Sequence, residues 1–170
     1  ALKKAFNIII RIKSSFKYTT DILRTLQTSS SEFFRLKTPS EKTKFIKTKL
    51  VKLGKEKYGF KASAHTLNEL EINFDNEDII PHEWLFDIHW YTESGDYKLL
   101  SLELAVECEW SIMRKRDKKK IPFGGIKYDF QKLLATNAKL RLMIFKMPEK
   151  YNFEKLNDYF ERTIKNYQNI

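Results

Sequence analysis

Apolar and charged residues alternate along residues 100–110. The even positions are all apolar, and the odd positions include Glu103, Glu107 and Glu109. Because successive side chains on a β-strand point to opposite faces, this run predicts a strand with one buried face and one face that carries carboxylates. Like charges on one strand face repel each other. The clustering of acid on the most regular strand of the chain therefore makes it the first candidate for a functional site.

A second strand is predicted over residues 84–91, where the even positions are again apolar, and a turn follows at residues 93–96. The two strands are therefore expected to form an antiparallel hairpin. A two-residue loop would place Asp87 opposite Leu102, on the wrong face, whereas a three-residue loop places Asp87 opposite Glu103. The apolar positions of the two strands coincide only in the second register, so we expect Asp87 to share the glutamate face.

Helical periodicity and short apolar runs predict the remaining elements. Helices are expected at residues 2–17, 20–27, 29–36, 39–57 and 126–136 and from residue 153 onward, and further strands at residues 69–75 and 140–145. The order from residue 39 is then helix, three strands, helix, strand and helix. This order predicts an α/β fold in which helices flank a mixed sheet.

Capping residues mark the expected starts of four helices. Thr38–Glu41 supplies an N-cap, a proline in the first turn and a capping-box glutamate. Ser29 with Glu32 forms a similar pattern, and Thr20 and Asn152 are candidate N-caps. We expect residues 1–37 to form a helical arm that packs on the rest and is a candidate for homodimerisation, and residues 38–170 to form the α/β domain.

Composition and charge narrow the class of partner. The 170 residues suffice for one domain with a packed core, and the net charge of +10 favours an anionic partner such as nucleic acid. Seven lysines between residues 42 and 57 are interpreted as a solvated or phosphate-facing surface. The single cysteine, Cys108, excludes a disulfide framework and predicts a reducing, cytoplasmic location. No apolar run approaches the roughly 20 residues of a membrane helix, so no membrane partner is expected.

Carboxylates that converge beside basic segments suit a metal-dependent phosphodiesterase. Asp87, Glu107 and Glu109 are the candidate ligands of Mg²⁺ or Mn²⁺, and Glu103 remains an alternative to Glu107. Basic residues outside this cluster are expected to hold a nucleic-acid backbone. They are Arg114, Lys115, Arg116, Lys118, Lys119 and Lys120.

This pattern resembles the PD-(D/E)XK nuclease superfamily, whose core is a helix, a three-strand meander, a helix and a fourth strand. The resemblance covers roughly residues 39–146. Asp87 looks like the acid of the second strand, and Glu107-Cys-Glu109 looks like the acid-x-Lys of the third, with Glu in place of Lys. Asp129-Phe-Gln-Lys132 is similar to the helix that follows the Glu-x-Glu motif in some members.

The resemblance implies a restriction-endonuclease-like fold and a metal-dependent nuclease, a hydrolase for which DNA is favoured over RNA. It implies that Asp87, Glu107 and Glu109 act with the metal and that Lys132 positions the attacking water. Helical spacing places Lys132 away from the apolar stripe, which is typical of a solvated lysine. Some members place a further acid on the first helix, here Glu41 or Glu56.

Other interpretations remain open. The scaffold could be a catalytically inactive module that binds nucleic acid or protein, with its glutamates solvated on an open sheet face. His89 shares the face of Asp87 and is either a support for the site or a half-buried histidine. A membrane-surface protein is least favoured, because the apolar residues of the N-terminal helix are needed for packing.

Overall fold

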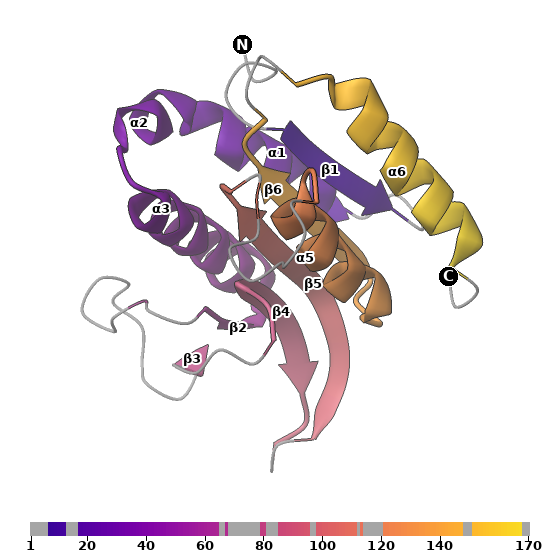
Figure 1. Ribbon diagram of the computed structural model, residues 1–170. Coiled ribbons are helices and arrows are strands. Elements are labelled where there is room, and N and C mark those ends of the chain that lie inside the picture. The colour runs from indigo at the N-terminus through magenta and orange to yellow at the C-terminus, as the bar shows by residue number, and fades with distance from the viewer. Residues whose placement is uncertain are drawn as a thin grey trace.

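The computed structural model shows an α/β protein in which two helical layers enclose a mixed sheet (Figure 1). It describes residues 7–12, 17–64, 67, 79–80, 85–95, 98–111, 113, 121–147 and 151–167. Within these ranges the sheet has six strands in the order β1-β6-β5-β4-β2-β3. The expected class, an α/β fold with helices on both sides of a mixed sheet, is confirmed.

The bounds of the elements are as follows. The strands are β1 (Asn7–Ile12), β2 (Lys61–Ser63), β3 (Ile79–Ile80), β4 (Ile88–Glu93), β5 (Leu99–Glu109) and β6 (Leu140–Phe145). The helices are α1 (Lys17–Thr28), α2 (Ser30–Arg35), α3 (Pro39–Lys52), the π-helical turn η2 (Leu53–Lys57), α5 (Gly124–Ala135) and α6 (Phe153–Asn166).

Strand β5 lies inside the sheet, between β6 and β4. It pairs antiparallel with β4 and parallel with β6. The hairpin register differs from the expected one: Ile88 lies opposite Val106 and His89 opposite Ala105, so Asp87 comes beside Glu107 and not Glu103. The expected register is therefore wrong by four residues, although Asp87 stays on the predicted parity.

Two features of the hairpin produce this shift. Between the paired residues Glu93 and Leu99, five residues form the connection where three were expected, and Gly95 adopts a φ of +63° there. Irregularities between Trp90 and Tyr91 and between Thr92 and Glu93 each add one residue to β5. One irregularity turns the following side chains of β5 to the opposite face relative to β4, and the second turns them back. Asp87 therefore stays on the same face as the odd-numbered residues of β5.

Each face of the sheet carries its own apolar core. On one face, α1 and α3 pack against β4 and β5 through residues that include Ile22, Ile46, Trp90 and Val106. On the other, α5 and α6 pack against β5 and β6 through residues that include Ala105, Ile126, Phe130, Met143 and Phe160. Figure 1 shows these helices on opposite sides of the sheet. The glutamate face is therefore covered by α5, which contradicts the alternative in which the glutamates are solvated on an open sheet face.

The N-terminal segment differs from the expected helix at residues 2–17. Residues 7–12 form β1, which pairs antiparallel with β6 and places the latter inside the sheet. The three consecutive isoleucines at residues 8–10 are β-branched and favour a strand. Helix α1 begins at Lys17, so Thr20 lies inside the helix and is not its N-cap.

The capping signals have mixed outcomes. Thr38 and Glu41 form the predicted capping box, and the Asn152 side chain accepts a hydrogen bond of 2.7 Å from the Glu154 N–H. Ser29 makes no side-chain capping bond, although α2 follows it. A cap whose partners lie within three residues is set by local geometry, so it is read most directly from sequence.

The second predicted strand starts later than expected. Strand β4 begins at Ile88, because Phe86 packs with the α5 and α6 core while Ile88 and Trp90 pack with the opposite one. The strand expected at residues 69–75 lies outside the described residues, and within the described ranges β2 is the strand that pairs with the other side of β4. Within the described ranges, no helix is both long and apolar enough to cross a membrane.

Gly54 in η2 provides a stability test. A Cβ added there would lie 2.6 Å from Trp90 Cε2, in a fully buried contact. Overpacking costs about 1–3 kcal/mol, and the clash with a rigid ring is expected to outweigh the roughly 1 kcal/mol that alanine gains in a helix. We expect Gly54→Ala to lower the free energy of unfolding by about 2 kcal/mol in urea and to change the near-ultraviolet circular dichroism.

The matched control is Gly59→Ala. Gly59 has a φ of +67° with no atom within 4 Å of an added Cβ. It should cost about 1 kcal/mol through backbone strain alone and leave the aromatic signal unchanged. An unfolding free energy of Gly54→Ala equal to or above that of the wild type would contradict the packing argument.

Candidate functional site

Four charged residues from four segments meet at the end of the hairpin. Asp87 precedes β4, Glu107 lies on β5, Lys132 comes from α5 and Lys47 from α3. We call these four residues the carboxylate–lysine cluster. The two carboxylates come together because the register pairs Ile88 with Val106, which brings the preceding and following residues side by side.

Both oxygens of Asp87 are engaged. Its Oδ2 accepts a hydrogen bond of 2.8 Å from the backbone N–H of Cys108, and its Oδ1 lies 3.3 Å from Lys47 Nζ. Lys47 is only 5% exposed, so its ammonium has little water around it. A buried cation beside a carboxylate is stabilised by the pairing and fixes the carboxylate in one orientation. Asp87 is therefore held rigidly between the strand and α3.

Glu107 is paired with Lys132 beneath α5. The distance between Glu107 Oε1 and Lys132 Nζ is 2.5 Å, and Lys132 Nζ also lies 3.8 Å from Asp129 Oδ1. Glu107 is 4% exposed. Burial raises the pKa of Glu107 to about 8; Lys132 opposes this shift, and the charges of Asp87 and Asp129 add to it. Burial also lowers the pKa of Lys132, but its contacts with Glu107 and Asp129 outweigh this effect and leave the pKa raised.

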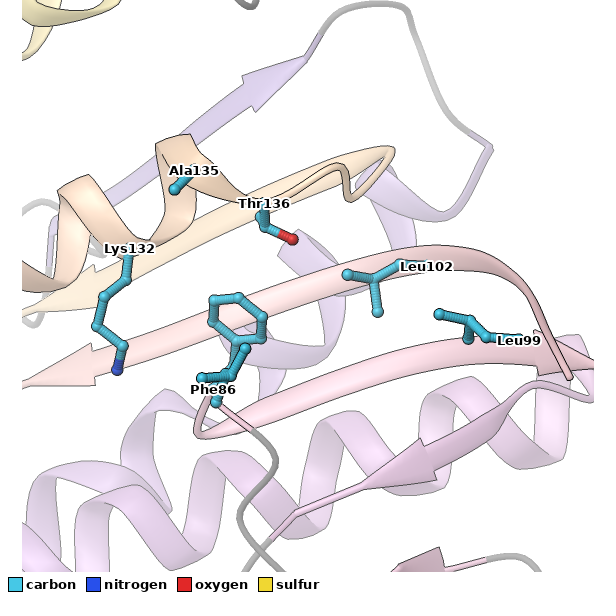
Figure 2. A pocket seen from close by; sticks show the side chains of 7 residues that line it. Phe86, Leu99, Leu102, Lys132, Ala135 and Thr136 are labelled. Atoms are coloured by element: carbon cyan, nitrogen blue, oxygen red, sulfur yellow. The ribbon is translucent and has the colours of Figure 1, made fainter. Parts of the chain in front are cut away.

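Lys132 is not a solvated lysine, so the expectation from helical spacing is wrong. Its side chain is 29% exposed and reaches down from α5 to the sheet (Figure 2). A lysine has a long apolar stem, which lets its ammonium reach a group well away from the position of its Cα. The structure therefore brings Lys132 to Glu107, beside Asp87.

Glu109 occupies a different place. Its Oε1 accepts a hydrogen bond of 2.6 Å from the Ser111 N–H, and its Oε2 lies so close to Gly125 that an added Cβ would be 2.7 Å away. The carboxylate thus sits at the first turn of α5, where the helix N-terminus favours negative charge. This contact accounts for the separation of Glu109 from Asp87 and Glu107.

Glu103 belongs to a separate polar group on the same strand. Its Oε1 lies 2.6 Å from Lys139 Nζ and accepts a hydrogen bond of 2.6 Å from Ser101 Oγ, and its Oε2 accepts one of 3.3 Å from the Tyr18 hydroxyl. Burial raises the pKa of Glu103, but Lys139 and Ser101 outweigh it and leave the pKa lowered. Glu103 therefore does not replace Glu107 beside Asp87.

The metal-ligand set is smaller than expected. Among the residues that the structure describes, no three His, Cys, Asp or Glu side chains are grouped so that they could hold a metal ion. Asp87 and Glu107 remain as the carboxylate pair. Mg²⁺ keeps several of its waters and is commonly bound by one or two carboxylates together with substrate phosphates, so a pair of this kind suits it.

Lys47 was missed by the sequence analysis, which assigned all seven lysines of residues 42–57 to the outer faces. A signal was present: Lys47 precedes Val51 by one helical turn, and Val51 is fully buried. Of the acids considered on the first core helix, Glu41 closes the capping box and Glu56 is exposed, so neither joins the cluster.

Two other expectations concern His89 and the basic connection. His89 is fully buried and packs on the Tyr91 ring at a centroid distance of 5.5 Å, so the alternative of a half-buried histidine is wrong. Burial lowers its pKa to about 4, so it is neutral at pH 7. The six basic residues between 114 and 120 lie outside the described residues.

The raised pKa of Glu107 predicts an unusual pH dependence of stability. Between its ordinary pKa of 4.5 and the folded value of about 8, the folded state binds the proton more tightly than the unfolded state. The free energy of unfolding should therefore fall by on the order of 3 kcal/mol as the pH rises through this window. We expect Glu107→Gln to remove this loss in urea unfolding measured at pH 5, 6.5 and 8.

Glu103→Gln is the matched control, because the pKa of Glu103 is lowered. Its carboxylate contributes stability that is present above its unfolded pKa and is lost as pH falls through the folded one. The Glu103→Gln protein should keep the loss of stability between pH 5 and 8. If Glu107→Gln and the wild type have parallel pH profiles, the proposed burial of charge at Glu107 is wrong.

The buried ion pair between Lys47 and Asp87 gives a second prediction for stability. Lys47→Met keeps the stem and leaves Asp87 without its buried cation. We expect a loss of about 2–4 kcal/mol in urea unfolding at pH 7, since removing one partner of a buried pair strands the other charge. Lys52→Met, on the more exposed side of α3, should stay within about 0.5 kcal/mol of wild type. Equal effects of the two substitutions would contradict the role assigned to Lys47.

Comparison with protein-family models, with curated proteins and with solved structures finds no match.

Proposed function

We propose that the chain is a metal-dependent nuclease with a restriction-endonuclease-like core. The observation that carries the proposal is the meeting of Asp87 and Glu107 with Lys132, which comes from the helix after the glutamate strand. These are the residues at which the sequence resembles the PD-(D/E)XK superfamily. Their grouping depends on the observed register, which pairs Ile88 with Val106, and on the 2.5 Å contact between Lys132 Nζ and Glu107 Oε1.

The order of elements gives a second line of support. Helix α3 is followed by β2, β4 and β5, which form an antiparallel meander, and then by α5 and by β6, which lies parallel to β5. The superfamily core has the same sequence of a helix, a three-strand meander, a helix and a fourth strand. The short β3 and the N-terminal β1 are additions at the two edges of this sheet.

In this proposal Asp87 and Glu107 hold Mg²⁺ or Mn²⁺ together with a substrate phosphate. Such an ion, when bound, would supply charge stabilisation at the phosphate and activation of the attacking water. Lys47 keeps the Asp87 carboxylate oriented, and Lys132, which is paired with Glu107, would add positive charge beside a bound phosphate. Glu109, held at the first turn of α5, supports the helix that carries Lys132 and is not assigned as a ligand.

The expected substrate is nucleic acid, with DNA favoured over RNA. The net charge of +10 attracts a phosphate backbone without reading its sequence. The runner-up is a catalytically inactive module on the same scaffold, which would bind nucleic acid in a salt-dependent manner and leave it intact.

The test is a cleavage assay on end-labelled single-stranded and double-stranded DNA and RNA in Mg²⁺, Mn²⁺ or EDTA. We expect cleavage only with metal, and a loss of at least about 100-fold in Glu107→Gln and Asp87→Asn, because removing a ligand removes much of the charge stabilisation. Lys132→Met should lower the rate at saturating substrate more than it changes the substrate concentration needed for half-maximal rate.

Glu103→Gln is again the matched control. Glu103 is a buried, lysine-paired glutamate on the same strand, 6% exposed against 4% for Glu107. The Glu103→Gln protein should cleave at the wild-type rate after correction for the fraction that is folded. If the wild type cleaves none of these substrates in Mn²⁺ but binds them in a way that salt abolishes, the nuclease proposal is contradicted and the inactive nucleic-acid-binding module is favoured.

A further inference from the structure

A pocket of about 420 Å³ lies between α5 and the hairpin of β4 and β5 (Figure 2). Its walls include Leu85, Phe86, Leu99, Leu102 and Ala135, with Lys132 and Thr136 from the last part of α5 and just after it. Small-molecule sites span roughly 300–1,000 Å³. The space therefore suits a group the size of one ring system and its attached sugar.

The pocket is continuous with the carboxylate–lysine cluster. Lys132 belongs to both: its stem lines the pocket, and its ammonium pairs with Glu107. Phe86 lines the pocket and is followed directly by Asp87 in the chain. Figure 2 shows Lys132 and Phe86 side by side at one end, with Leu102 and Leu99 farther along the hairpin. A molecule whose phosphate lies at the cluster thus has its adjoining group at the mouth of this pocket.

The lining chemistry selects what this group can be. Among the described lining residues, the polar side-chain groups are the Thr136 hydroxyl and the Lys132 ammonium, and the latter is already paired with Glu107. The walls offer an aromatic ring and aliphatic side chains, which contact the flat face of a ring well but do not read its hydrogen-bonding edge. A second anionic group would meet, among these described lining residues, no cation other than Lys132, which is already paired with Glu107.

We propose that this pocket holds one unpaired nucleobase of the strand whose phosphate lies at the carboxylate–lysine cluster. The inference rests on the proposed function and specifies its substrate as single-stranded or locally unpaired nucleic acid. A base inside a duplex must first leave its stack, at a cost of a few kcal/mol, whereas an unpaired base enters without this cost. Because the walls do not read the base edge, the pocket requires a base but discriminates weakly among bases.

The experiment measures binding in EDTA, where metal-dependent cleavage does not occur. A fluorescein-labelled 12-nucleotide single strand is compared by fluorescence anisotropy with the same backbone that carries abasic sites throughout. Stacking of one base on an aromatic side chain contributes enough for about a tenfold change in affinity. We expect the wild type to bind the base-bearing strand at least about tenfold more tightly than the abasic strand.

Two substitutions test the pocket. Leu85→Ser opens its wall, and Ala135→Phe fills it from the exposed end of α5; both should reduce the affinity for the base-bearing strand to that for the abasic one. The control for Leu85→Ser is Leu100→Ser, because Leu85 and Leu100 are each 65% exposed and only Leu85 lines the pocket. The control for Ala135→Phe is Ala135→Ser, whose small side chain does not fill the pocket. Both controls should bind as the wild type does.

Equal binding of the two strands by the wild type would overturn the pocket assignment, and so would no binding of either strand both in EDTA and in Ca²⁺, which takes oxygen ligands as Mg²⁺ does. So would equal losses in Leu85→Ser and Leu100→Ser, which would indicate a general apolar surface. These outcomes are independent of the nuclease proposal, which depends on metal-dependent cleavage and its loss in Glu107→Gln. A base-dependent gain in affinity without any cleavage would support the base-binding pocket and contradict the nuclease proposal.

Discussion

The burial of Glu107 under α5 is the constraint around which the site is built. A carboxylate that is 4% exposed has lost its water, and the ammonium of Lys132 at 2.5 Å replaces only part of that solvation. Burial therefore keeps the pKa of Glu107 high, at about 8. This pairing joins α5 to the central strand through charge at one point, while Phe130 and the other apolar residues of α5 do so along the rest of the helix.

Burying paired charged side chains in this way costs free energy of folding and is not needed for stability alone. Well-packed apolar residues in place of a buried ion pair are often as stable or more so, and strongly shifted pKa values gather at functional sites. Here two such pairs lie together, Asp87 with Lys47 and Glu107 with Lys132. The cost is understandable if a divalent cation binds between the two carboxylates, because a cation supplies the charge compensation that the lysines provide only in part.

The contrast between Glu103 and Glu107 shows how far local surroundings decide the chemistry of one residue type. Both lie on β5, both are buried, and each has a lysine partner. Glu103 also receives hydrogen bonds from Ser101 and Tyr18, and its pKa is lowered. Glu107 has acidic neighbours in Asp87 and Asp129, and its pKa is raised. Only the second environment places two carboxylates, those of Asp87 and Glu107, next to each other.

The sequence by itself determined the elements whose signals are local. The alternation along β5, the apolar run of β6, the capping box at Thr38 and the cap at Asn152 each depend on residues a few positions apart, and each was predicted correctly. Tertiary structure decided what depends on distant partners: the pairing of β1 with β6, the two irregularities that set Asp87 beside Glu107, and the reach of Lys47 and Lys132 into the cluster. A strand register is the sum of loop length and bulges, and a lysine stem spans several ångströms, so neither is fixed by the periodicity of the chain.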